Sequence, residues 1–284
     1  MKTRVPVVKT LKLFIGGAFA RSESGRTYPL NAGGDNVNVA LASRKDVRDA
    51  VTSARSSWPG WSARSAYNRG QILYRLAEIM EARRSQFAEC LMLAGKTRAA
   101  AEREFDKTVD LIVWYAGWCD KIEQQFSTKN PVGGPHFNVS SPEPTGVVGV
   151  IAPRTPGLLG LAAATLPALC GANTVVALAS ESEPMSAVAF AEAIATCDLP
   201  AGALNILTGI RESVAQHLAA HMDVNALGIW DCDATVAKRL QTAAVDNVKR
   251  VRIFGADAAA AQALSPHRIL DFLEIKTVWH PAGV

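Results

Sequence analysis

The stretch that decides the fold is residues 146–178, GVVGVIAPRTPGLLGLAAATLPALCGANTVVAL. Residues 147–152 form a continuous apolar run of strand length, 158–169 have the length and composition of a buried helix, and 173–178 are rich in β-branched residues. A strand, a helix and a second strand in this order predict a βαβ unit, in which both strands are parallel and buried on both faces.

The same region could be misread as a membrane span, because residues 155–180 carry no charge and are numerous enough to cross a bilayer. Proline, glycine and asparagine interrupt the run at Pro156, Gly157, Gly160, Pro167, Gly171 and Asn173. These interruptions favour a buried helix followed by a buried strand, so no membrane association is expected.

The alternation continues towards the C-terminus. Strands are expected at 204–207, 226–230 and 248–254, and helices at 184–196, 211–220 and 233–244. This rhythm predicts an α/β fold with a Rossmann-like parallel sheet covered on both faces, and a ligand site beyond the carboxyl ends of its strands. The glycine fingerprint G-x-G-x-x-G is absent from the chain, so the pattern predicts where a ligand binds without identifying it.

Upstream of this region the pattern predicts short strands and then a layer of helices. The strands are expected at 13–15 and 27–28. Ser43 and Asp46 have the spacing of a capping box, which starts a helix that Trp58–Trp61 should end. Two longer helices are expected next, one through 72–80 that bends before Phe87 and stops at Gly95, and one over about 97–126.

Changes of composition divide the chain into four segments. These are 1–126, N-terminal strands and a helical layer; 127–145, a proline- and glycine-rich connector or oligomerisation segment with a strand around 137–140; 146–264, an α/β domain of the nucleotide-binding type; and 265–284, which contains a C-terminal oligomerisation strand starting at Leu273. The helical layer carries no obvious chemistry.

Composition excludes several classes of function. The 284 residues are 49% hydrophobic and 20% charged, and the net charge of +4 has no long run of one sign, so neither nucleic acid nor a membrane surface is an expected partner. The N-terminal ten residues lack an apolar stretch of signal-peptide length, which makes the cytoplasm the expected location.

The cysteines and histidines do not predict a metal site. Five cysteines stand at 90, 119, 170, 197 and 232 without any CxxC spacing, so neither a disulfide scaffold nor structural zinc is expected. Cys90, Cys119 and Cys170 are predicted to be core thiols. His217 and His221 have helical i, i+4 spacing but no third ligand, and a solvent-facing pair is expected there.

Several motifs, in order and in register, resemble those of the aldehyde dehydrogenase superfamily. They are Leu13-Phe14-Ile15-Gly16-Gly17, Trp58 with Trp61, residues 146–153, Pro167-Ala168-Leu169 with 173–176, Leu199-Pro200-Ala201-Gly202, His221-Met222-Asp223-Val224 and the closing 274–278. The resemblance implies a nicotinamide-binding α/β domain and a small β extension that pairs subunits.

The resemblance also implies a reaction that this chain lacks the groups to perform. Aldehyde oxidation in the family uses a cysteine nucleophile, an asparagine that stabilises the oxyanion and a glutamate base. Thr155 stands at the asparagine position and Arg252 at the glutamate position. About twenty residues separate Gly255 from the closing strand, and none is cysteine, so the catalytic domain has no room.

The nucleotide-binding positions implied by the resemblance are also altered. Leu178 replaces the lysine that binds the adenosine ribose, whereas Glu181 matches its acidic partner. The turn that receives the pyrophosphate falls on Trp230, Asp231 and Cys232, where the Asp231 carboxylate should repel phosphate. Together with Thr155, these positions are vestigial, and NAD or NADP is expected to bind weakly or not at all.

Two residues near the expected ligand site could still have a function. Cys232 is the remaining candidate nucleophile, but the flanking carboxylates of Asp231 and Asp233 should raise its pKa and suppress the thiolate. Arg154 could bind a phosphate or a partner's carboxylate, although a surface salt bridge is the favoured interpretation.

The favoured hypothesis is an inactive aldehyde-dehydrogenase-like subunit with a structural or regulatory role. It would associate with itself or with a full-length aldehyde dehydrogenase through the closing strand, with Ile275, Thr277, Val278 and Trp279 at the interface. The alternatives are an NAD(P)-dependent oxidoreductase acting on aldehydes, alone or within a mixed complex, and a dinucleotide-binding module that senses without reacting.

Overall fold

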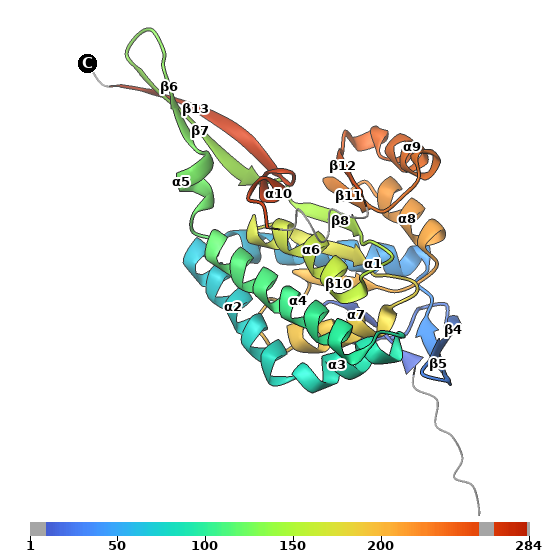
Figure 1. The fold of residues 1–284 in the computed structure, drawn as a ribbon. Helices are drawn as coiled ribbons and strands as arrows, with labels where there is room; N and C mark the ends of the chain where they lie inside the picture. Colours follow the sequence, from blue (N-terminus) through green and yellow to red (C-terminus); the bar gives the residue numbers. More distant parts are fainter. Residues whose placement is uncertain (1–9, 256–263, 283–284) are drawn as a thin grey trace, which may run out of the picture.

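The structure is a computed structural model of the chain and describes residues 10–255 and 264–282. Its centre is a seven-stranded sheet in the order β12-β11-β8-β9-β10-β2-β3 (Figure 1). The strands are β2 (Leu13–Ile15), β3 (Ala18–Ala20), β8 (Val147–Ile151), β9 (Thr174–Leu178), β10 (Leu204–Leu207), β11 (Ala226–Trp230) and β12 (Arg250–Phe254).

The five strands from β8 to β12 are parallel, so the predicted Rossmann-like fold is confirmed. The N-terminal hairpin of β2 and β3 extends the same sheet, because β2 pairs antiparallel with β10. Strand β12 begins two residues later than predicted. Val248 precedes it with a left-handed backbone (φ +56°) and is exposed, so it belongs to the turn.

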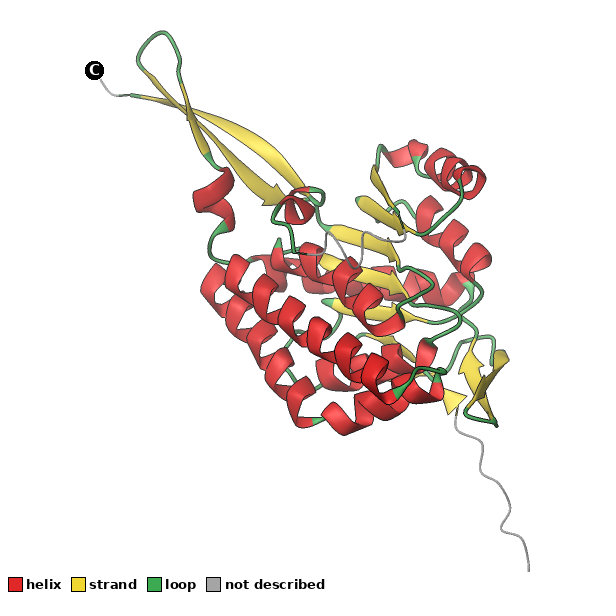
Figure 2. Ribbon diagram, viewed as in Figure 1, coloured by secondary structure: helices red, strands yellow, loops and turns green. Residues whose placement is uncertain are grey.

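Helices cover both faces of the sheet (Figure 2). One core contains side chains of α2 (Ala66–Ala82), α3 (Arg84–Leu93), α4 (Arg98–Trp118), α6 (Gly157–Cys170) and α7 (Pro184–Ile194). The other contains side chains of α1 (Arg44–Ser62), α8 (Arg211–Ala220) and α9 (Ala234–Ala243). The sheet contributes residues to both cores, which makes a three-layer α/β architecture.

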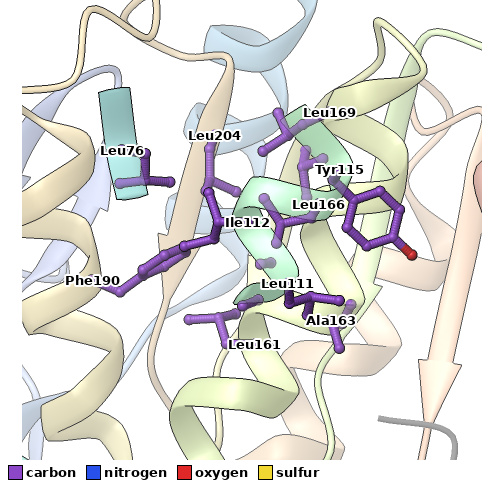
Figure 3. Packing of buried hydrophobic residues seen from close by; sticks show 14 of the residues in the cluster. Leu76, Leu111, Ile112, Tyr115, Leu161, Ala163, Leu166, Leu169, Phe190 and Leu204 are labelled. Carbon is purple, nitrogen blue, oxygen red and sulfur yellow. The ribbon is translucent and has the colours of Figure 1, made fainter. Parts of the chain in front are cut away.

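Helix α6 lies between the sheet and α4, and all of its residues are buried. Figure 3 shows Leu161, Ala163 and Leu166 of α6 against Leu111 and Ile112 of α4. This burial on every side explains why the sequence of α6 is uncharged throughout its length. Among the described residues, no helix is long and apolar enough to cross a membrane.

The first helix ends one residue beyond the predicted Trp58–Trp61 segment, so Pro59 does not break it. Helix α1 starts at the predicted Ser43 capping box but runs to Ser62 with Pro59 inside it. Pro59 removes one backbone hydrogen bond. The helix continues because Trp61 is fully buried beside Ile72 and Ala203, and this burial outweighs the local cost of proline.

The predicted helix over 97–126 is two helices. Helix α4 ends at Trp118, and after a short turn α5 (Ile122–Phe126) begins. The bend predicted before Phe87 falls between α2 and α3, and Gly95 has a left-handed backbone (φ +92°) just after α3, as expected for a helix stop.

A three-stranded sheet projects from the body as an arm (Figure 1). It consists of β6 (Thr128–Asn130), β7 (His136–Pro144) and β13 (Leu273–Pro281), which we call the arm. Strand β13 pairs antiparallel with β7 along its whole length, from Leu273 opposite Pro144 to Pro281 opposite His136. The segment predicted as a connector is therefore largely strand.

A small sheet, a 3₁₀ turn and a short helix complete the described fold. Strands β1 (Thr10–Leu11), β4 (Thr27–Ala32) and β5 (Asp35–Ala40) form a separate sheet in the order β1-β5-β4. A 3₁₀ turn, η1 (Val245–Asn247), precedes β12, and α10 (His267–Leu270) precedes β13.

Candidate functional site

The order of the parallel strands defines where a ligand would bind. From β8 the chain builds β9 and β10 on one side of the sheet and then crosses to build β11 and β12 on the other. Ligands of open α/β sheets bind beyond the carboxyl ends of the strands at this reversal. The candidate site is therefore the crevice at the ends of β8 and β11, where the chain continues into Ala152 and Asp231.

The guanidinium of Arg211 occupies this crevice. Arg211 is the first residue of α8, and only 8% of its surface is exposed. Its guanidinium donates hydrogen bonds to the carbonyl oxygens of Ala152 and Trp230, and to that of Asp231 at 3.2 Å. Ala152 follows β8 and Trp230 ends β11, so one side chain bridges the two strands at the reversal.

Burial lowers the pKa of Arg211, and the charge of Arg154 acts in the same direction, while Asp231 and Glu181 oppose both. Arg211 nevertheless keeps its proton at neutral pH, because the ordinary pKa of arginine lies far above it. The crevice thus contains a positively charged guanidinium that donates hydrogen bonds to main-chain carbonyl oxygens.

Glu181, the predicted partner of a nucleotide ribose, is engaged within the protein. Its Oε2 accepts a hydrogen bond from the backbone N–H of Arg211 at 3.0 Å, at the start of α8. The Tyr28 hydroxyl donates to the Glu181 carbonyl oxygen at 3.1 Å. Burial, with the Glu181 charge as a smaller cause, raises the pKa of Tyr28, so this hydroxyl remains a donor.

Leu178, which stands where the resemblance implies a lysine, is fully buried at the end of β9. It pairs with Ile151 on one side and with Leu207 on the other, and all three belong to the same core cluster. Its apolar side chain is part of the packing and offers no hydrogen bond to a ligand.

An interaction between Asp231 and Arg154 joins the turn after β11 to the loop after β8. Asp231 has a left-handed backbone (φ +51°), and its carboxylate accepts the Arg154 N–H at 3.3 Å. The Arg154 guanidinium lies 3.9 Å from that carboxylate and donates to the Asp231 carbonyl at 3.2 Å. This is the salt bridge favoured for Arg154. Trp230 is buried and stacks on Phe254 with ring centroids 4.2 Å apart.

The cavity beside the Arg211 guanidinium is very small. The cavity beside Arg211 and Cys232, closed by residues of α8 and α9, has a volume of about 10 Å³. A ligand pocket for a small molecule measures roughly 300–1,000 Å³, whereas one water molecule needs roughly 10–15 Å³. This cavity has room for one water molecule and not for a nucleotide.

The N-terminus of α6, beside Thr155, is also occupied by the protein's own side chains. Thr155 itself is exposed in the loop between β8 and α6. The N–H of Gly157 donates to Glu183 Oε2 at 2.9 Å, and the N–H groups of Leu158 and Leu159 donate to Glu104 Oε1 at 3.0 and 3.2 Å. Backbone donors at a helix N-terminus can stabilise an oxyanion, but these already bind carboxylates.

Lys96 neutralises both of these carboxylates. Its Nζ lies 2.8 Å from Glu104 and 3.2 Å from Glu183. Burial by itself lowers the pKa of Lys96, but its hydrogen bonds and charge interactions with the two glutamates outweigh burial and raise the pKa overall. Because three charged side chains satisfy one another here, this cluster stabilises the N-terminus of α6.

Cys232 has the properties of a poor nucleophile. It is half-buried, and its pKa is raised mainly by burial, with Asp233 and Asp231 adding to the shift and Arg211 opposing it. The expected direction is correct, but burial contributes more than the flanking carboxylates. A raised pKa leaves little of the thiolate form at neutral pH.

Three other thiols are buried. Cys119 and Cys170 lie with their sulfurs 3.6 Å apart, and both thiols donate to the Tyr115 carbonyl oxygen. Cys197 is also buried, whereas Cys90 is half-buried. The prediction of core thiols is confirmed for Cys119 and Cys170, but their proximity was not predicted.

Arg252, at the expected position of the catalytic base, lies on the exposed edge strand β12 and pairs with Asp271 at 3.2 Å. His217 and His221 are half-buried rather than solvent-facing. Over residues 10–255 and 264–282, no cluster of three or more histidine, cysteine or acidic side chains is arranged to hold a metal ion.

The lowered pKa of His221 predicts a small decrease in the free energy of unfolding in mild acid. Burial lowers its pKa below 6.5, with Lys249 and Arg44 acting in the same direction and Asp223 opposing them. Its Nδ1 accepts the Asp223 N–H at 3.2 Å, which requires the neutral ring. This contribution is complete above pH 6.5 and is lost as pH falls through 6.5 towards the folded pKa.

His221→Asn should therefore flatten the dependence of the melting temperature on pH between about 7 and 5. The difference should be a fraction of a kcal/mol, because water screens a half-exposed ring. His217→Asn, on the same helix, is the matched control. Equal pH profiles for wild type and His221→Asn would contradict the prediction.

Sequence reasoning missed the residues that occupy the two parts of the site, namely Arg211 at the carbonyl acceptors of the crevice, and Glu104, Glu183 and Lys96 at the N-terminus of α6. Arg211 did carry a signal, since a charged residue directly after an apolar strand and Gly209 lies at the carboxyl edge of the sheet. The acidic pair gave no comparable signal, because Glu104 lies 54 residues from Leu158 along the chain.

The fold and the crevice together define an α/β domain of the nucleotide-binding type that carries a β arm. The chain belongs to the aldehyde dehydrogenase family, because the model of that family matches residues 26–256. Among curated relatives, it is 32% identical over 250 residues to cytosolic 10-formyltetrahydrofolate dehydrogenase of Pongo abelii, covering 85% of this chain and 28% of that protein. It is 33% identical to aldehyde dehydrogenase, cytosolic 1, of Elephantulus edwardii, covering 87% of this chain and 50% of the relative.

Solved structures give the same result. PnpE from Pseudomonas sp. WBC-3, in complex with nicotinamide adenine dinucleotide, superimposes with a TM-score of 0.82 at 29% identity over 86% of this chain and 50% of that one. The NAD⁺ complex of aldehyde dehydrogenase from Bacillus cereus has a TM-score of 0.81 at 26% identity, over 87% and 51% of the two chains. The chain thus spans at most about half the length of these relatives.

Proposed function

We propose that this chain is a catalytically inactive aldehyde-dehydrogenase-like subunit with a structural or regulatory role. The observation that carries the proposal is that the protein's own side chains already bind the donors and acceptors at both parts of the site: Arg211 in the crevice, and Glu104 with Glu183 at the N-terminus of α6. In addition, residues 255–272 alone lie between β12 and β13. That interval leaves no room there for a second domain.

NAD and NADP are not expected to bind with useful affinity. PnpE and the Bacillus cereus enzyme have been crystallised with NAD. For this chain we propose that NAD and NADP bind weakly or not at all. The cavity of about 10 Å³ and the absence of a hydrogen-bond donor on Leu178 support this proposal.

The arm supports a role in subunit association. On β13, Ile275, Val278 and Trp279 are each exposed by 57–60%, and Phe137 of β7 is 49% exposed. Strand β13 is also an edge strand of nine residues, whose outer backbone groups can pair with another strand. We propose that a second copy of this chain or a full-length aldehyde dehydrogenase covers this surface, and that association takes place in the cytoplasm.

The association is tested by coexpressing the chain with full-length relatives from the same cell and measuring the mass of the purified species. A defined homo-oligomer or mixed oligomer is expected. A stable monomer, alone and in every coexpression, would count strongly against the proposal.

A second candidate function rests on Cys232, whose thiol lines the crevice. The chain would then oxidise aldehydes with NAD or NADP. We expect no aldehyde-dependent reduction of either nucleotide, because burial raises the pKa of Cys232 and the crevice does not fit the cofactor. Turnover that disappears in Cys232→Ala, but persists in the matched Cys90→Ala, would establish the alternative instead.

A further inference from the structure

We propose that Arg211 is an internal occupant of the ligand crevice, and that its guanidinium holds together the strand ends that a bound nucleotide would otherwise contact. The inference concerns the crevice alone and is independent of pairing through the arm.

The position of the guanidinium carries the first step. Its hydrogen bonds to Ala152 and Trp230 join the residues that leave β8 and β11, the two strands between which the order of the sheet reverses. This is where open α/β sheets bind ligands. The side chain therefore lies in the ligand position itself.

The contacts of Arg211 explain why it stays there. Three main-chain oxygens accept its guanidinium protons, and the Glu181 carboxylate accepts its backbone N–H. Moving the guanidinium out would remove its hydrogen bonds to the buried oxygens of Ala152 and Trp230, which is costly, whereas the Asp231 carbonyl would keep Arg154 as a donor. A nucleotide would have to displace all of these contacts before it could enter.

The neighbouring Arg154 does not make the hydrogen bonds that hold Arg211 in the crevice. Arg154 is exposed and reaches the same turn through the carbonyl and carboxylate of Asp231, at the rim of the crevice. It makes no contact with the carbonyls of Ala152 or Trp230 among the hydrogen bonds of the described residues. Arg154 is therefore a matched control, since it has the same charge and lies at the rim of the same cavity, but among the described residues its guanidinium bonds only to Asp231 there.

Calorimetric titration with NAD and with AMP tests the proposal. Wild type and Arg154→Ala should show no saturable binding at millimolar nucleotide. Arg211→Ala should bind AMP saturably, with a dissociation constant at least roughly tenfold below the lower limit set by wild type, because truncation removes the competitor and enlarges the cavity; this factor corresponds to about 1.4 kcal/mol. Unchanged binding in folded Arg211→Ala would overturn the proposal.

A second variant and a second measurement cover the case in which Arg211→Ala does not fold. Arg211→Lys keeps the charge and most of the stem, but one ammonium cannot span the same three carbonyls, so AMP affinity should rise less than in Arg211→Ala. In wild type, the Arg211 Nη–H signals in a ¹⁵N spectrum should exchange slowly with water and remain unshifted by NAD. If wild type binds micromolar NAD and the Arg211 signals shift, the proposal that Arg211 occupies the crevice is wrong. That result would not bear on subunit pairing through the arm.

Discussion

Glu104→Ala is expected to lower the free energy of unfolding by about 3–5 kcal/mol, the range found when one partner of a buried ion pair is removed. Glu104 is 8% exposed, accepts the N–H groups of Leu158 and Leu159, and pairs with Lys96 at 2.8 Å. The substitution leaves two backbone donors and one ammonium without this partner at the start of a fully buried helix. The midpoint of urea denaturation measures the loss.

Glu102→Ala is the matched control for this prediction. Glu102 lies on the same helix, has a side chain that is 45% exposed, and pairs with Arg98 at 3.4 Å in an i, i+4 arrangement. An exposed pair of this kind contributes about 0.3–0.5 kcal/mol, so the two variants should differ several-fold. If Glu104→Ala and Glu102→Ala unfold at the same urea concentration, the carboxylate cluster does not stabilise α6 as argued.

Glu104→Gln separates the two roles of the carboxylate. The amide oxygen can still accept from the backbone of α6, but the charge that pairs with Lys96 is lost. The loss of stability should therefore lie between those of Glu102→Ala and Glu104→Ala.

The parallel sheet could be predicted from sequence because each βαβ unit repeats a local pattern. Strands β10 and β11 and helix α8 have the predicted bounds, since apolar runs bounded by glycine, proline and polar residues identify them locally. Helix α1 shows the limit of local reasoning. Pro59 is a local stop signal, but burial of Trp61 in a distant cluster decides where the helix ends.

The position of the candidate site could be predicted from the sequence, but the side chains that occupy it could not. The resemblance predicted which family positions had lost their chemistry, such as Leu178 and Thr155. It did not predict what had filled the crevice, because the contacts of Arg211 with Ala152 and Trp230 join residues 59 and 19 positions apart. Such contacts depend on the order of strands in the sheet, which alternation alone does not specify.

Both parts of the site are filled in the same way, by a charged side chain that binds main-chain groups a substrate or cofactor would otherwise contact. Arg211 binds carbonyl oxygens, whereas Glu104 and Glu183 bind N–H groups. The arm shows the opposite pattern, since its apolar side chains and its edge strand face outwards. The difference is consistent with a chain that binds a partner subunit and not a small molecule.

The double substitution Ile275→Asp with Trp279→Asp should convert the proposed oligomer to monomer. Both residues lie on one face of β13, opposite Pro142 and Asn138 of β7, and both are exposed in the single chain. Apolar and aromatic anchors of an interface contribute about 2 kcal/mol or more each, so two of them predict a dissociation constant raised roughly a thousandfold. Analytical ultracentrifugation over a range of protein concentrations measures this constant.

Tyr67→Asp is the control for the arm variant, because Tyr67 is a comparably exposed aromatic residue (68%) on α2, on the body and not the arm. It should leave the oligomer unchanged. Val278→Asp distinguishes the two faces of the arm, since Val278 lies opposite Val139 on the other side of the sheet. Dissociation by Ile275→Asp with Trp279→Asp alone would indicate contact through one face, and dissociation by Val278→Asp as well would indicate that the arm is enclosed by its partner. An oligomer that survives all three arm substitutions, but dissociates in Tyr67→Asp, would move the interface to the helical layer and refute the assignment to the arm.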